Sequence, residues 1–122
     1  QYVHRTGQTK SSVINPAVDE WLRMQDHPRI GFVSIETGER RAVVTDGPQV
    51  WTIAEAWLAH EPADRSPWAV SDAVGVPVML VEAALAYWAD HRNEIDVVIS
   101  RHHRAQDEAL AAWERRQALK SA

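Results

Sequence analysis

The stretch that decides the fold is Trp51 to Asp96, WTIAEAWLAHEPADRSPWAVSDAVGVPVMLVEAALAYWADHRNEID. Its apolar residues recur at helical spacing and predict helices over residues 52–60, 68–74 and 78–91. Glu61-Pro62 ends the first helix, Ser66-Pro67 starts the second, and Gly75 ends it. A packing helix followed by two helices around a short glycine-containing turn predicts the tri-helical arrangement of a helix-turn-helix.

The chain before this stretch begins with a polar arm and a short helix. Residues 1–14 contain basic side chains and no acidic one, and we expect a loose arm there. Asn15 followed by Pro16 is typical of a helix start, and the helix should run to about Gln25. Three apolar side chains at helical spacing predict its buried face: Val18, Trp21 and Leu22.

Residues 29–45 change from a helical to a β-type period. Two runs rich in β-branched and aromatic residues surround a turn that contains Gly38, which predicts a β-hairpin. A lone hairpin is only marginally stable in water. We therefore expect it to pack on a helix or to pair with the hairpin of a second copy through an exposed edge.

The last segment, from Asn93 to about Leu119, has no glycine or proline and predicts one long helix. Its apolar residues recur at threes and fours and form one stripe. So small a body cannot cover so long a helix, so we expect its distal half, from about His103 onward, to pack on another chain. The stripe consists of Ile95, Val98, Ile99, His102, Ala105, Ala109, Ala112 and Trp113.

Composition limits the classes of function. The net charge of −4 and the pI near 5.8 argue against a chain whose whole surface binds nucleic acid. The chain has no cysteine, which excludes disulfides and thiolate metal sites. No apolar run approaches the roughly 18 residues of a membrane span, and no signal-peptide pattern opens the sequence, so we expect a soluble cytoplasmic protein.

Three short sequence motifs occur in order along the chain. They are Gln49–Thr52 (QVWT), Leu80–Ala89 (LVEAALAYWA) and, at a fixed distance after it, Glu94-Ile95-Asp96. With these motifs, residues 45–100 resemble the small antitoxin-like family known as domain of unknown function 433. The resemblance implies a homeodomain-like helix-turn-helix that is often dimeric. It also implies the antitoxin of a toxin–antitoxin pair, whose toxin is a PIN-type ribonuclease and whose antitoxin represses its own operon.

The third predicted helix departs from this pattern. It has no Lys or Arg from Pro77 to Asp90, and Glu82 stands where family members often carry Arg. Base readout relies on Arg, Lys, Asn or Gln, so this helix is a poor base reader. If operator DNA is bound, the better phosphate contacts are basic residues elsewhere in the chain. These are Arg5, Lys10, Arg40, Arg41 and Arg65.

No catalytic constellation emerges from the sequence. The acidic residues are scattered along helices rather than grouped to hold a catalytic metal, and there is no glycine-rich phosphate loop or nucleophile elbow. His102 and His103 with Asp107 could form a metal site, but a histidine pair at the edge of an interface stripe is the better interpretation. We expect no enzyme activity, no cofactor and no metal.

We therefore predict a mainly α fold with a small N-terminal β-hairpin. Residues 1–48 contain the N-terminal arm, a helix and this hairpin, residues 49–92 form a homeodomain-like helix-turn-helix core, and residues 93–122 form a long C-terminal helix that binds a partner. The leading hypothesis is a homodimeric antitoxin whose long helix neutralises a PIN-type ribonuclease. The alternatives are a stand-alone DNA-binding regulator and an adaptor whose long helix mediates only self-assembly. The residues expected to contact the partner are Ile99, Arg101, His102, Arg104, Ala109, Trp113, Arg115, Arg116 and Leu119.

Overall fold

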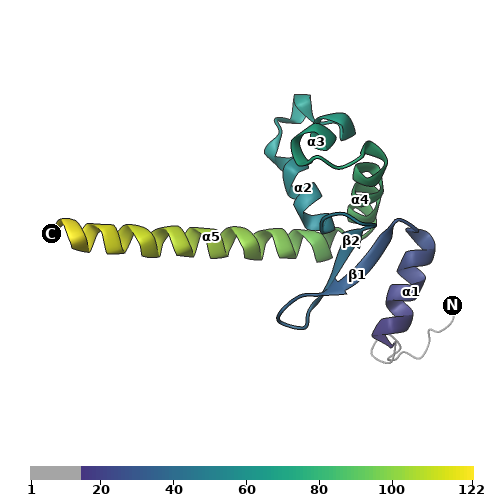
Figure 1. The fold of residues 1–122 in the computed structure, drawn as a ribbon, viewed down its shortest axis with the longest axis horizontal. Helices are drawn as coiled ribbons and strands as arrows, with labels where there is room; N and C mark the ends of the chain where they lie inside the picture. Colours follow the sequence, from purple (N-terminus) through teal and green to yellow (C-terminus); the bar gives the residue numbers. More distant parts are fainter. Residues whose placement is uncertain (1–14) are drawn as a thin grey trace.

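The computed structural model describes residues 15–122. They form a mainly helical fold with one antiparallel β-hairpin and a long C-terminal helix (Figure 1). This architecture confirms the coarse fold class expected from the sequence. The elements follow in the order α1 (Pro16–Asp26), β1 (Ile30–Ser34), β2 (Arg40–Val44), α2 (Val50–Ala59), the 3₁₀ turn η2 (Pro62–Asp64), α3 (Pro67–Val74), α4 (Val78–Asp90) and α5 (Arg92–Ser121).

One hydrophobic core joins the hairpin, α2, α3, α4 and the first turns of α5. In the hairpin, Ile30 pairs with Val44 and Phe32 pairs with Ala42, which places these side chains on one face of the sheet. That face packs on α2 and α4, so the hairpin is stabilised by helices of its own chain. The largest fully buried side chains are Tyr87, Ile53, Val44, Val50, Val70 and Val81.

The breaks between α2, α3 and α4 have the physical causes expected from the sequence. The Ser66 hydroxyl accepts a hydrogen bond from the Ala69 amide (3.0 Å) and caps α3. Gly75 has a φ of 72° and ends α3 in the left-handed region, where a glycine is not strained. Residues 75–77 connect α3 to α4, and the two helix axes differ by 113°.

The sequence predicts that Trp68, Ala69 and Ala73 form the apolar side of residues 68–74, and this prediction is wrong for two of the three. Trp68 and Ala73 are exposed, whereas Val70 is fully buried in the core. In a helix of eight residues the apolar side chains do not define a single stripe. The capped start at Ser66 and the bend after Gly75 fix the rotation of α3 instead.

The buried face predicted for α1 is also wrong. Trp21 is 56% exposed, and Val18 and Leu22 lie beside it on the outer side of the helix. Polar side chains attach α1 to the body: Glu20 accepts two hydrogen bonds from the Arg40 guanidinium (2.8 and 2.9 Å). Bidentate carboxylate–guanidinium pairing holds that end of the helix against β2 with its polar face inward.

A buried tyrosine hydroxyl links α1, α4 and α5. Tyr87 is 0% exposed, and its hydroxyl donates to Glu94 Oε2 and accepts from Arg23 Nη1, both at 2.8 Å. Arg23 also pairs with the Glu94 carboxylate. Burial raises the pKa of Tyr87 above its ordinary value, so the hydroxyl remains a hydrogen-bond donor at every physiological pH.

α5 is anchored only at its beginning. Its 30 residues span about 45 Å, yet its buried side chains are Ile95, Val98 and Ile99 in the first turns. One turn later the His102 ring lies against Trp51, with ring centroids 4.5 Å apart. Beyond this point the helix leaves the body and projects into solvent (Figure 1).

Between Asn15 and Ala122, no single helix is both long enough and apolar enough to cross a membrane. α3 and α4 meet those criteria only when they are taken together across their bend of 113°.

Replacing Tyr87 with Phe should lower the free energy of unfolding by about 1–3 kcal/mol, because Glu94 and Arg23 lose a buried partner. Urea denaturation measures this change. Trp21→Ala serves as the control and should change stability by less than about 0.5 kcal/mol, since that indole is mostly in solvent. A larger effect at Trp21 than at Tyr87 would contradict the orientation of α1.

The His91 ring should make the fold acid-sensitive. Burial and the nearby Arg23 charge lower the pKa of His91 below its ordinary value of 6.5, with His27 acting in the same direction and Glu94 and Asp90 opposing. Just below pH 6.5 the unfolded chain therefore binds more protons at His91 than the folded chain does. The stability that the neutral ring contributes is lost as the pH falls through the pKa of the folded state.

The free energy of unfolding should thus decrease between about pH 7 and pH 5, measured by urea denaturation at each pH. His91→Gln should reduce the slope. An unchanged slope in this variant would assign the acid sensitivity to another group.

Candidate protein-binding surface

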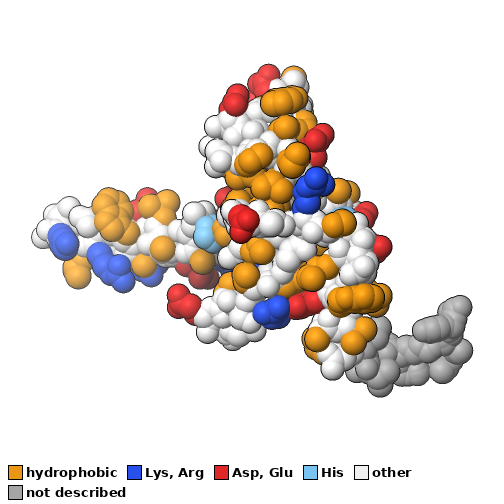
Figure 2. Space-filling model, turned by 45° about the vertical axis from the view of Figure 1, so that its right-hand side comes forward, with side chains coloured by type: hydrophobic (Ala, Val, Ile, Leu, Met, Phe, Trp, Pro, Cys, Tyr) orange, Lys and Arg blue, Asp and Glu red, His pale blue; other side chains and the backbone are white. Residues whose placement is uncertain are grey.

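Residues 105–121 of α5, together with Ala122, form what we call the projecting segment. It is helical to Ser121 because it is rich in alanine and contains no glycine or proline. Trp113 is 55% exposed and Leu119 is 77% exposed, and Leu110 is also open to solvent. Figure 2 shows hydrophobic and basic side chains along this helix, away from the body.

These apolar side chains have no packing partner in the part of the chain that the structure describes. Burying a tryptophan or leucine side chain contributes roughly 2 kcal/mol at about 25 cal/mol per Å². Grouped exposed apolar side chains of this size mark interaction sites. The projecting segment therefore has the composition of a protein-binding helix.

The expected partner contacts divide into two groups. Arg104, Ala109, Trp113, Arg115, Arg116 and Leu119 are exposed on or next to the projecting segment. Ile99 is 6% exposed and belongs to the core, so its side chain is occupied by the body and the expectation for this residue is corrected. His102 packs on Trp51, and Arg101 reaches Glu39 (3.4 Å), so both contact the body as well.

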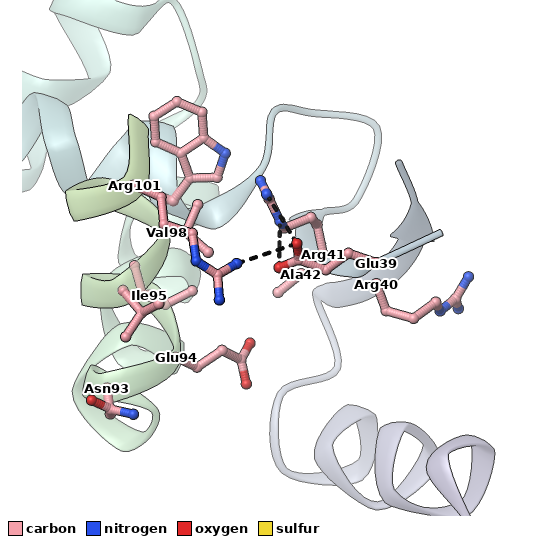
Figure 3. A pocket seen from close by; sticks show the side chains of 11 residues that line it. Glu39, Arg40, Arg41, Ala42, Asn93, Glu94, Ile95, Val98 and Arg101 are labelled. Atoms are coloured by element: carbon pink, nitrogen blue, oxygen red, sulfur yellow. Dashed lines mark hydrogen bonds and ion pairs between the residues drawn. The ribbon is translucent and has the colours of Figure 1, made fainter. Parts of the chain in front are cut away.

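A cavity of about 360 Å³ lies between the end of the hairpin and the first turns of α5 (Figure 3). In it the Glu39 carboxylate accepts hydrogen bonds from Arg41 Nε (3.1 Å) and Arg101 Nη1 (3.4 Å). The Arg41 hydrogen bond lowers the pKa of Glu39, which therefore stays ionised. The Glu39 carboxylate thus pairs with guanidinium groups from β2 and from α5, and these ion pairs join the hairpin to α5.

The residues proposed for DNA phosphates make contacts within the chain. Arg40 is paired with Glu20, and Arg41 with Glu39. Arg65 Nε donates to the carbonyls of Trp57 and His60, both at 3.0 Å. Its Nη2 donates to the carbonyl of Leu58 (3.2 Å). Arg5 and Lys10 lie outside the described residues.

The role of Arg65 was missed in the sequence. Its guanidinium donates to the carbonyls of Trp57, Leu58 and His60 at the end of α2, and it brings a positive charge to the negative end of the helix dipole. A signal was present, because an arginine just beyond a helix end is a recognised capping residue. The intervening proline turn η2 directs the chain back toward that end.

The histidine pair does not gather ligands around a metal. His102 packs on Trp51, whereas His103 Nε2 lies 2.6 Å from Glu55 Oε2 on α2. Among residues 15–122 no group of three or more His, Asp or Glu side chains could hold a metal ion. Both rings instead fasten α5 to α2.

No protein-family model, curated protein or solved structure matches this chain.

Arg65→Ala should lower the free energy of unfolding by roughly 1–2 kcal/mol, because three carbonyls at the end of α2 lose a charged donor. The matched control is Arg104→Ala, which removes an exposed arginine from α5 and should have almost no effect. Equal destabilisation by both substitutions, measured by urea denaturation, would contradict the capping role.

Proposed function

We propose that this chain is a non-enzymatic regulator that binds a protein partner through the projecting segment of α5. The observation that carries the proposal is the exposure of Trp113 on a regular helix that leaves a well-packed body. Tryptophan and arginine dominate the binding energy of protein interfaces. The segment supplies Trp113 together with Arg115 and Arg116.

The resemblance to the antitoxin-like family favours a PIN-type ribonuclease toxin as that partner. Such a toxin holds its catalytic metal with acidic side chains, and exposed arginines are chemically suited to pair with them. Arg104, Arg115 and Arg116 are exposed and form no ion pair within residues 15–122. In this proposal Trp113 and Leu119 fill an apolar groove while the arginines cover the acidic site.

A second candidate function is DNA binding by α3 and α4. Two helices at 113° joined by three residues that include Gly75 lie within the range of a helix-turn-helix, which supports the homeodomain-like assignment. The exposed side of α4 opposes direct base readout, because it carries Met79, Glu82, Ala86 and Ala89 without a basic residue. Autorepression of an operon would then depend on backbone contacts made by other parts of the molecule.

Truncation after Arg104 tests the leading proposal. It removes the projecting segment and keeps the contacts of His102 and His103 with the body. Co-expressed with the product of the adjacent reading frame, the full chain should form a stable stoichiometric complex and suppress RNA cleavage, and the truncated chain should do neither. Trp113→Ala should weaken binding by tenfold or more, since buried interface tryptophans contribute about 2 kcal/mol.

Trp68→Ala is the matched control, because Trp68 is even more exposed than Trp113 but lies on α3. A truncated chain that still binds the toxin would overturn the assignment to α5. Tight, salt-sensitive binding to its own promoter, with no protein partner, would favour the second candidate.

A further inference from the structure

α5 carries a heptad pattern that continues from the core into solvent. Ile95 and Val98, which are buried in the body, occupy the first two seam positions of a seven-residue repeat. The same two positions along the rest of the helix are taken by His102, Ala105, Ala109, Ala112, Arg116 and Leu119. The seam that packs on the body therefore extends along the projecting segment, with Arg116 as its one charged position.

We infer that this exposed seam pairs with the same segment of a second copy of the chain, in antiparallel orientation. A two-fold axis makes such an interface self-complementary, because each residue contacts the residue at the mirrored position. With Ala109 against Ala112 of the second copy, the central layers contain only small side chains and the helices approach closely. Leu119 then lies opposite His102 of the second copy, where Trp51 adds apolar surface.

Charge complementarity selects this register. Glu108 and Arg115 are one heptad apart and flank the seam on the same side. In the antiparallel pair Glu108 of each copy faces Arg115 of the other, so the symmetry generates two ion pairs. Within residues 15–122 of one chain these two residues form no ion pair.

A parallel pair of the same helices is unfavourable. It would bring the two Arg116 side chains into one layer, and like charges in direct contact repel. In the antiparallel pair Arg116 lies opposite Ala105, whose small side chain leaves room for the arginine stem while the guanidinium reaches solvent. Trp113 lies on the other flank and covers Gln106 of the second copy.

The length of the projecting segment fits this arrangement. His102 and His103 are the last side chains that contact the body, and the helix ends at Ser121. In this register residues 102–119 of the two copies overlap over about 27 Å, and each tip reaches the His102 and Trp51 rings of the other copy. The pair therefore covers the projecting segment of both copies at once.

This inference deepens the proposed function and rests on it in one respect: if α5 binds a toxin, self-pairing and toxin binding use the same surface and exclude each other. Free regulator would then be a dimer that a toxin must open. The self-pairing itself requires no toxin and is tested on the full chain alone, so its failure leaves the proposed function intact.

Sedimentation equilibrium of the full chain tests the charge register. The wild-type chain should be a dimer, and Glu108→Arg or Arg115→Glu alone should raise its dissociation constant about tenfold, because two attractive pairs become repulsive. The double variant Glu108→Arg/Arg115→Glu should restore the dimer. Glu114→Arg is the matched control, since it makes the same change of charge on the outward side of α5 and should leave the dimer unchanged.

Cysteine cross-linking tests the orientation, since the chain contains no native cysteine. A mixture of Ala109→Cys and Ala112→Cys chains should form the mixed disulfide faster than either variant forms its own, because those positions face each other. Preferential cross-linking of identical positions would show a parallel pair and overturn the inference. A monomeric full chain, or a dimer that survives truncation after Arg104, would overturn it as well.

Discussion

The buried hydroxyl of Tyr87 is the constraint on which the arrangement of the outer helices depends. A hydroxyl inside an apolar core must find a partner, and here Glu94 from the first turn of α5 accepts a hydrogen bond from it while Arg23 from α1 donates one to its oxygen. Because Glu94 must reach inward, the first turn of α5 is fixed against α4. Because Arg23 must reach the same place, α1 turns its polar face to the body and its tryptophan to solvent. A single satisfied polar group thus decides both where the long helix starts and which face of the first helix stays exposed.

Local signals explain why the elements themselves could be predicted from the sequence. Three of these signals are helix caps, whose hydrogen bonds and backbone angles involve only neighbouring residues: Asn15, Ser66 and Gly75. The hairpin follows from the change of hydrophobic period around Gly38. Which face of a helix packs on the body depends on residues far apart in the chain, so it was harder to predict from the sequence. Val18, Trp21 and Leu22 have the spacing of a buried stripe, but the contacts that orient α1 join positions separated by 20 to 71 residues. No periodicity within the helix could show that its charged side would be the inner one.

The candidate surface was partly predictable for a related reason. A helix of 30 residues without glycine or proline is too long for this body, so the projection of its distal part follows from length alone. The exact end of the contact with the body was not predictable. Ile99 was expected to contact a partner but is buried in the body, and His102 and His103 still touch α2. The basic residues Arg40, Arg41 and Arg65 show the same limit. Sequence reveals their charge, but only the fold reveals that carboxylates and helix carbonyls of the same chain already bind them.

The anchoring of α5 at one end also has a consequence for how the protein melts. An isolated helix of about 18 residues is marginally stable in water, because only its own backbone hydrogen bonds hold it. Whenever no second molecule covers it, residues 105–122 will unwind from the free end on mild heating, while the core around Tyr87 remains folded and unfolds later as one unit. Helix content and core packing will then follow different melting curves, and one transition temperature will not describe the whole chain.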